Sequence, residues 1–173
     1  MKKIAVLIAN GSEEIEVLTP LDILRRTEAK ADLISVSDKT VKCSHQVLIT
    51  ADSVINEVDL SSYDAIVIPG GMPGATNIAN EEKVMLALKK MDKEGKLIAS
   101  ICASPAVVLK SSGVLEGKRA TCYPAPLFVD MLGECYTGSD VEVFDNVITA
   151  NGPKSAMKFA LAICNALNLL PKF

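Results

Sequence analysis

The chain has no tryptophan, a single histidine and few aromatic residues, which make up 4% of its 173 residues. It has no basic excess, because 18 Lys and Arg stand against 21 Asp and Glu, a formal net charge of −3. This balance argues against general nucleic-acid binding, since phosphates require a positively charged surface. Hydrophobic residues reach 49%, which excludes a disordered chain. We expect one domain over residues 1–173 with an aliphatic core.

Long apolar runs are absent too. None approaches the roughly 18 residues of a membrane-spanning helix, so no membrane partner is expected. The first run, Ile4–Ala9, leads into polar sequence without a cleavage-site pattern, and we interpret it as a strand and not as a signal peptide. No cysteine pair has C-x-x-C spacing, which indicates neither a zinc site nor a disulfide scaffold. Free thiols fit a reducing compartment, so we expect a cytoplasmic protein without a metal. The cysteines are Cys43, Cys102, Cys122, Cys135 and Cys164.

Short continuous apolar runs alternate with helical patterns along the chain. Unlike alternating strands, such runs are typical of parallel strands covered on both faces. The predicted strands are Ile4–Ala9, Ala65–Ile68 and Leu97–Cys102, and the predicted helices are Glu14–Thr27, Glu81–Glu94 and Ser155–Leu169. The order predicts an α/β fold with a doubly wound, mostly parallel sheet and helices on both faces.

Apolar side chains at helical spacing indicate which helix faces are buried. The stripe of the first helix is Ile15, Leu18, Leu21 and Leu24, and that of the second is Val84, Leu88 and Met91. Turn residues also predict added hairpins. One is Val41–Thr50, and a second group comprises Glu134–Tyr136, Val141–Phe144 and Val147–Ala150.

Cys102 stands where an apolar strand runs directly into a predicted helix. Ser104 is a good N-cap and Pro105 a good first helical residue, so Cys102 falls on a tight strand-to-helix connection. This is the layout of a nucleophile elbow with sulfur in place of oxygen. Unpaired amides at a helix start lower the pKa of a thiol, which would make Cys102 reactive. The alternative is a buried inert cysteine, the usual state of a free thiol.

A glycine-rich turn, Gly70–Ala75, follows the strand Ala65–Ile68. It fits neither the P-loop nor the dinucleotide-binding pattern. Doubly wound folds bind ligands at the carboxyl ends of their strands, so its amides are candidates for an oxyanion site beside Cys102. A plain tight turn explains the same residues.

Acidic residues open the first helix. Glu13 and Glu14 suit the helix dipole and are expected to face water. Glu16 lies near the predicted inward stripe and can point toward Cys102, where a buried carboxyl would stay protonated and donate a hydrogen bond. The single histidine, His45, lies in the first hairpin, where a surface position is more usual than a general base.

Several segments, taken in order, resemble the ThiJ/PfpI superfamily in its Parkinson-disease protein deglycase branch. They span nearly the whole chain, and their ordered combination is far more specific than any one of them. The segments are Ala9–Glu16, Pro20–Arg26, Ile68–Ala75, Ala99–Pro105 and Asn151–Pro153 with the last helix.

The resemblance implies a flavodoxin-like fold, a homodimer and no cofactor. It implies that Cys102 is a reactive, oxidisable thiol bonded to the protonated carboxyl of Glu16. Gly71 and Ala103 would supply the amides of an oxyanion pocket next to Gly70. Asp22 and Arg26 match residues near the dimer interface of family members.

The chain departs from the family pattern at three positions. Tyr123 stands where many members carry a histidine, and with a reference pKa of ~10 it is a poor base at neutral pH. His45 stands where relatives often have arginine, which weakens an anion-binding patch near the dimer interface. Ala103 stands where the protease branch has histidine directly after its cysteine, so peptidase activity is rejected. Glutamine amidotransferase activity is rejected as well, because no histidine follows His45.

The resemblance implies a glyoxalase or deglycase that acts on methylglyoxal or its protein adducts. In that reaction the Cys102 thiolate adds to the aldehyde, the amides of Gly71 and Ala103 hold the oxyanion, and Glu16 moves the proton. The alternative is a peroxide-sensing or chaperone-like protective protein that uses the same thiol without significant turnover. A third interpretation is a flavodoxin-like scaffold with an inert thiol.

Overall fold

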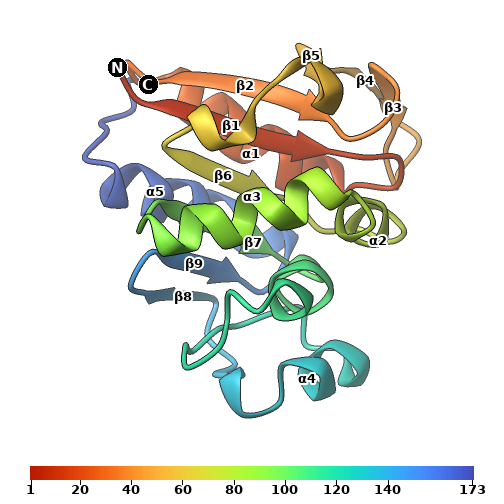
Figure 1. The fold of residues 1–173 in the computed structure, drawn as a ribbon, viewed down its shortest axis with the longest axis vertical. Helices are drawn as coiled ribbons and strands as arrows, with labels where there is room; N and C mark the ends of the chain where they lie inside the picture. Colours follow the sequence, from red (N-terminus) through yellow and green to blue (C-terminus); the bar gives the residue numbers. More distant parts are fainter.

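The computed structural model describes all residues, 1–173. Its main sheet has seven strands in the order β5-β2-β1-β6-β7-β9-β8 (Figure 1). Every neighbouring pair is parallel except β8 and β9, which are antiparallel. The chain therefore starts near the middle of the sheet and winds outward in both directions, which confirms the predicted fold class. The strands are β1 (Lys3–Ile8), β2 (Lys30–Ser35), β5 (Ser53–Val54), β6 (Ala65–Ile68), β7 (Leu97–Ile101), β8 (Val141–Phe144) and β9 (Val147–Ala150).

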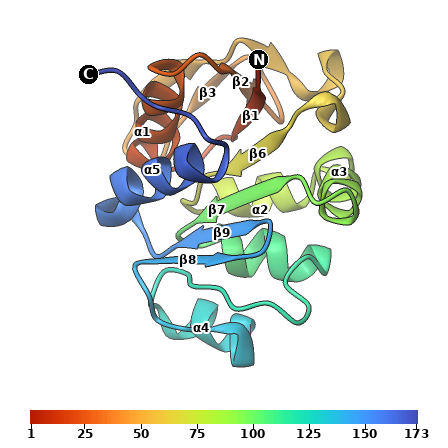
Figure 2. The same cartoon turned by 90° about the vertical axis from the view of Figure 1, so that its left-hand side faces the viewer.

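Helices cover both faces of this sheet (Figure 2). On one face lie α1 (Glu14–Arg25) and α5 (Ala156–Ala166), and on the other lie α2 (Gly74–Ala79), α3 (Glu82–Lys93) and a π-helical segment, Pro105–Lys110. A short helix, α4 (Pro126–Leu132), packs beside the π-helical segment. Each face has its own cluster of buried apolar side chains. The continuous apolar strands are explained by this double cover, because strand residues pointing either way enter a core.

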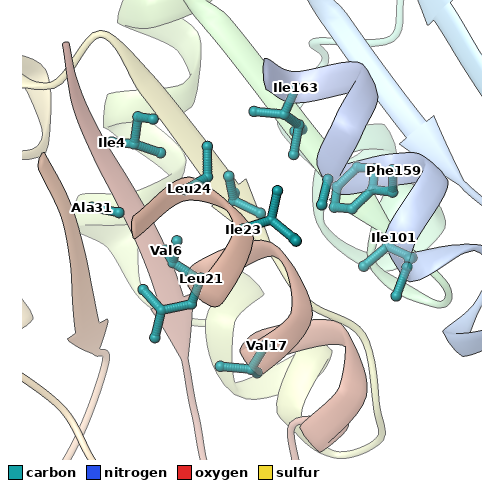
Figure 3. Packing of buried hydrophobic residues seen from close by; sticks show 14 of the residues in the cluster. Ile4, Val6, Val17, Leu21, Ile23, Leu24, Ala31, Ile101, Phe159 and Ile163 are labelled. Carbon is teal, nitrogen blue, oxygen red and sulfur yellow. The ribbon is translucent and has the colours of Figure 1, made fainter. Parts of the chain in front are cut away.

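The buried face of α1 differs from the predicted stripe. Leu21 and Leu24 are buried as predicted, together with Val17, and they pack toward β1 and α5 (Figure 3). Ile15 and Leu18 were expected inside, but they are 52% and 41% exposed. Both sets have helical spacing, so periodicity cannot choose between them. Contact with α5 on one side and the sheet on the other turns the face bearing Ile15 and Leu18 outward.

The first predicted hairpin is confirmed as a separate two-stranded sheet of β3 (Thr40–Lys42) and β4 (Leu48–Thr50). The second is only partly right. The strands β8 and β9 form a hairpin, but β9 also pairs in parallel with β7 and belongs to the main sheet. The segment Glu134–Tyr136 is no strand, since most of it lies in the 3-10 turn Gly133–Cys135.

The parallel strands β1, β6, β7 and β9 all end at one edge of the sheet, where the connections that follow them meet. Doubly wound folds place their ligand sites at this edge. No helix of the structure combines the length and the apolar character that crossing a lipid bilayer requires.

Candidate active site

Cys102 directly follows β7, in the tight connection to the π-helical segment. Its φ is +66°, a left-handed backbone conformation that is uncommon for residues other than glycine and frequent at functional sites. Its amide N–H donates to the carbonyl of Ala150 (2.9 Å), and its carbonyl accepts from the amide of Tyr123 (2.8 Å). These two bonds fix the turn from both sides, and Cys102 is only 9% exposed.

Ser104 does not cap the helix as predicted. Its backbone is already helical (φ −69°, ψ −30°), and its side chain bonds to no helical amide. Its hydroxyl donates instead to the buried carbonyl of Pro69. A buried carbonyl needs a donor, and Ser104 is close enough to supply one because the turn at Cys102 is so tight. The bond ties the glycine-rich loop to the cysteine turn.

The glycine-rich loop approaches Cys102 more closely than a side chain would allow. A Cβ on Gly70 would lie 2.5 Å from the Cβ of Cys102 and 2.7 Å from Oε2 of Glu16. Gly71 has a φ of +84°, and a Cβ there would lie 2.5 Å from both the carbonyl oxygen of Gly11 and the amide nitrogen of Glu13. Only glycine fits at either position.

The backbone amides of Gly71 and Ala103 lie close enough to the sulfur of Cys102 to favour its charged form and lower its pKa. One comes from the loop after β6 and the other from the turn that carries Cys102. Two such donors converge on the place where negative charge would develop on sulfur, or on an oxygen bonded next to it.

Glu16 lies in the first turn of α1 and is fully buried. Its Oε2 accepts a hydrogen bond from the amide of Gly70 (2.8 Å). Its side chain also faces the thiol of Cys102, and its Oε1 has no hydrogen-bond partner in the protein. The reasoning that placed Glu16 inward relied on Ile15 and Leu18, which are exposed, although the inward placement itself matches the structure.

Glu16 and Cys102 form a coupled acid–thiol pair. Burial raises the pKa of Glu16 to about 7, against the lowering effect of its bonds to Cys102 and Gly70. Burial also raises the pKa of the Cys102 thiol, and the charge of an ionised Glu16 raises it further. The amides of Gly71 and Ala103 act in the opposite direction without reversing the shift, so the prediction that amides at the helix start lower the pKa of Cys102 is wrong. The pair therefore accommodates one negative charge and resists a second, because two adjacent buried anions repel each other.

Glu13 and Glu14 do not face water as expected, since they are only 8% and 7% exposed. Glu13 caps α1 by accepting the amide N–H of Glu16 (2.9 Å). Glu14 accepts the amide N–H of His45 (2.6 Å) and lies 3.0 Å from its Nδ1. The turn of the β3–β4 hairpin covers both acids, for the amide of Ser44 donates to the carbonyl of Ser12 (2.9 Å). This long-range packing has no signal in the local sequence.

His45 is the partner of Glu14, and its contacts do not include Cys102. The hydrogen bond that the ring of His45 donates to Glu14 and the charge of that carboxylate raise the pKa of His45. Burial opposes the shift at Glu14, but bonds from its own amide, His45 and Ser44 hold its pKa at about 2. One group of side chains could hold a cation. It consists of Glu13, Glu14 and His45, whose possible ligand atoms all lie within 4.8 Å of one another.

Asp22 and Arg26 lie in the second half of α1 and at its C-cap, away from Cys102. The guanidinium of Arg26 bonds to the carboxylate of Asp22 (2.9 Å), and both side chains are exposed. Arg26 also stacks over the ring of Phe173 at 5.6 Å. Within one chain, the structure therefore does not bring these two residues to the candidate site.

Tyr123 lies on the side of Cys102 opposite to Glu16. Its amide bonds to the carbonyl of Cys102, while its side chain is 44% exposed. A Cβ on Gly152, in the loop after β9, would lie 3.2 Å from the tyrosine ring, so the ring packs over that loop. Sequence reasoning placed Tyr123 at the site only through the family resemblance, and it missed the residues of the β9 loop that lie beside it.

Comparison with known proteins shows similarity to one family over nearly the whole chain. The model of the DJ-1/PfpI family matches residues 2–166. Protein DJ-1 homolog B of Arabidopsis thaliana is 35% identical over 169 residues, which cover 96% of this chain and 38% of that protein, so the chain spans well under half of that relative's length. The Caenorhabditis elegans protein named glutathione-independent glyoxalase DJR-1.2 is 36% identical over 163 residues, covering 94% of this chain and 86% of that protein.

A solved structure, that of Toxoplasma gondii DJ-1 in its oxidized form, is similar to the chain throughout. The TM-score is 0.92 and the sequence identity 41%, over 96% of this chain and 91% of that one.

Proposed function

The chain belongs to the DJ-1/PfpI family, and on this premise we propose that it is a cysteine-dependent glyoxalase that converts methylglyoxal into lactate without glutathione or another cofactor. The observation that carries the proposal is the placement of the Cys102 thiol between the Glu16 carboxyl and the amides of Gly71 and Ala103. The name of the C. elegans relative supports the same reaction. Protein adducts of methylglyoxal are the alternative substrates.

The first step is addition of the Cys102 thiolate to the aldehyde carbon. A carbon–sulfur bond forms, and the electron pair of the carbonyl bond moves to oxygen. The amides of Gly71 and Ala103 stabilise that oxygen, as oxyanion donors do in acyl transfer. Glu16, which holds the proton of the Cys102 thiol, gives that proton to the oxygen. The product is a hemithioacetal attached to Cys102, and Glu16 is left as a carboxylate.

The second step is a proton transfer by Glu16. The carboxylate takes the proton from the former aldehyde carbon, and an enediolate forms. The hydroxyl proton on the first carbon passes to the oxygen of the neighbouring carbon, and the Glu16 carboxyl then returns its proton to that neighbouring carbon. A pKa of about 7 suits both directions at neutral pH. The result is a lactoyl thioester. Water then attacks its carbonyl, and the thiolate leaves with the electron pair, so one water is consumed for each lactate released.

Tyr123 and Gly70 have supporting roles in this proposal. Gly70 allows the nucleophile and the acid to approach each other and donates its amide to Glu16. Tyr123, on the open side, offers its hydroxyl as a hydrogen-bond donor to the substrate and does not act as a base.

A second candidate function is favoured by one observation, the oxidized form of the T. gondii relative. In this alternative, hydrogen peroxide oxidises the Cys102 thiolate to a sulfenic and then a sulfinic acid, each step adding one oxygen and releasing water. The amides of Gly71 and Ala103 and a protonated Glu16 would bind the new oxygens. All five cysteines are free, which suits a reducing compartment such as the cytoplasm.

Lactate formation from methylglyoxal in glutathione-free buffer tests the leading proposal. We expect lactate with the wild type and none with Cys102→Ser. Cys135→Ser, which removes a partly exposed thiol elsewhere, is the matched control and should keep the wild-type rate. The proposal fails if the wild type forms no lactate or if Cys102→Ser still does. Selective oxidation of Cys102 by peroxide, read by mass spectrometry, would then support the second candidate.

We also propose that the chain forms a homodimer through the outer faces of α1 and α5. These neighbouring helices expose Ile15, Leu18, Met157 and Leu161, and α1 carries the Asp22–Arg26 pair beside them. Light scattering should give twice the chain mass for the wild type and the single chain mass for Leu18→Glu. A monomeric wild type would contradict the proposal.

A further inference from the structure

A cavity of about 490 Å³ opens between Tyr123 and the loop that follows β9. Its size falls within the range of small-molecule sites, roughly 300–1,000 Å³. The loop after β9 and the start of α5 form one wall, and Tyr123 and Pro124 form another. The lining residues are Tyr123, Pro124, Asp140, Asn151, Gly152, Pro153, Lys154, Ser155 and Lys158.

Backbone hydrogen bonds and strand pairing join the lining of the cavity to the turn that carries Cys102. Strands β7 and β9 are parallel neighbours in which Ile101 pairs with Ala150, so Cys102 and Asn151 follow the paired residues at the same sheet edge. The amide of Cys102 bonds to the carbonyl of Ala150, and the amide of Tyr123 bonds to the carbonyl of Cys102. The cavity therefore lies on the β9 side of Cys102, whereas Glu16 belongs to the segment that follows β1.

The polar groups of the cavity leave one positive charge without a partner. The ammonium of Lys158 pairs with the carboxylate of Asp140 (2.8 Å), which also accepts a hydrogen bond from the side-chain amide of Asn151 (3.2 Å). The hydroxyl of Ser155 donates to Asn151 (2.6 Å). Lys154 is exposed at the mouth and makes no ion pair or side-chain hydrogen bond, and Asp140 is the only acid in the lining. The cavity thus has two cations and one anion.

From this charge distribution we infer that the cavity directs carboxylate-bearing electrophiles to Cys102, with Lys154 as the specificity-determining residue. The inference deepens the proposed glyoxalase function, on which its substrate class rests. The preferred substrates are α-oxoaldehydes whose tail, on the carbon next to the aldehyde, ends in a carboxylate. The small neutral methyl group of methylglyoxal leaves Lys154 unpaired, whereas an anionic tail reaches it.

A charge-neutralising substitution tests the inference by turnover. The substrates are methylglyoxal and carboxyethylglyoxal, in which a carboxyethyl group replaces the methyl group. We expect Lys154→Gln to lower the ratio of kcat/KM for carboxyethylglyoxal to that for methylglyoxal about 5-fold, as a partly exposed ion pair would. Asp140→Asn, which frees Lys158, should raise the same ratio. Lys93→Gln is the control, because it removes the same charge as Lys154→Gln at the C-terminal end of α3, near the amino ends of the strands. It should leave the ratio unaltered. An unchanged ratio in Lys154→Gln overturns the inference.

A second readout does not depend on turnover. Iodoacetate and iodoacetamide alkylate the same thiol and differ in one carboxylate. The rate ratio of iodoacetate to iodoacetamide at Cys102, followed by peptide mass spectrometry, should fall in Lys154→Gln and rise in Asp140→Asn. If this pattern holds while the wild type forms no lactate, the glyoxalase proposal fails and the anion-directing cavity stands. If lactate forms but neither ratio depends on Lys154, the cavity inference fails alone.

Discussion

The two sides of Cys102 are built differently. On the Glu16 side the carboxyl is fully buried, and a single added carbon on Gly70 would collide with both reacting groups. On the Tyr123 side lies an open cavity whose lysines are exposed. The contrast suggests that the two sides have different functions, proton transfer on the Glu16 side and substrate selection on the Tyr123 side. Proton transfer requires fixed distances, and the packed side provides them, while the open side is free to select among substrates of different size and charge.

The packed side also depends on many parts of the chain. Segments after β1, β6 and β7 meet there, and the β3–β4 hairpin covers the acids that precede Glu16. The open side depends mainly on the loop after β9 and on Tyr123. Substitutions on the packed side should therefore affect stability and rate together, and those on the open side should affect substrate preference.

The largest effect is expected from Gly70→Ala. Its methyl group would lie 2.5 Å from the Cβ of Cys102 and 2.7 Å from Glu16. Displacing both reacting groups should reduce kcat/KM by more than about 100-fold. Overpacking should cost about 1–3 kcal/mol of stability. Lactate formation and urea unfolding measure the two effects.

Gly113→Ala is the control for that substitution. A Cβ on Gly113 meets nothing within 4 Å, and the residue has a φ of +84°. Its replacement should cost about 1 kcal/mol of backbone strain and leave the rate intact. Equal losses of rate in the two variants would show that strain, and not the collision at the site, is responsible.

A pH-dependent stability difference is expected from Glu16→Gln. Burial raises the pKa of Glu16 from 4.5 to about 7, so the folded protein keeps a proton that the unfolded chain has released. The protonated carboxyl contributes its full stabilisation of the fold below pH 4.5, and this contribution is lost as the pH rises through 7. The total loss in the free energy of unfolding is about 3 kcal/mol. Glutamine stays neutral, so the variant should lose less stability over that range. Urea unfolding of both proteins from pH 4.5 to about 8 checks this, and parallel curves would contradict it.

The smallest effect is expected from Glu14→Gln, which should change the pKa of the exposed His45. The hydrogen bond between His45 and Glu14, together with the charge of the Glu14 carboxylate, raises the pKa of His45 above 6.5. Because the chain has one histidine, its imidazole resonances in NMR titrate without overlap. Glu14→Gln should return the pKa of His45 toward 6.5. An identical titration in wild type and variant would show that the pair does not form in solution.

Much of the fold could be predicted from the sequence because its central strands are continuous apolar runs. β1, β6 and β7 have no other plausible placement than a covered sheet. Strand β2, which lies between β5 and β1, was missed because charged residues interrupt its pattern, and α2 was missed because six residues are too few to show a helical period. The face of α1 was misassigned because two apolar stripes have the same spacing, and only packing against α5 decides between them.

The candidate site was predictable where a local pattern or the family resemblance marks it. Cys102 stands at a strand-to-helix junction, and the glycines of the Gly70–Ala75 turn follow a strand. The burial of Glu13 and Glu14 and the Lys154 cavity were not predictable. Both arise from segments far apart in the sequence, the hairpin over α1 in one case and the β9 loop against Tyr123 in the other.

The most direct test of these two functions compares the kcat and KM of Glu16→Gln with those of Tyr123→Phe, with methylglyoxal as the substrate. The account predicts that Glu16→Gln lowers kcat by at least about 100-fold, as the loss of a general acid–base group does. Tyr123→Phe should change mainly KM, because its hydroxyl binds substrate and moves no proton. The account is contradicted if Tyr123→Phe loses as much kcat as Glu16→Gln, or if Glu16→Gln keeps the wild-type kcat.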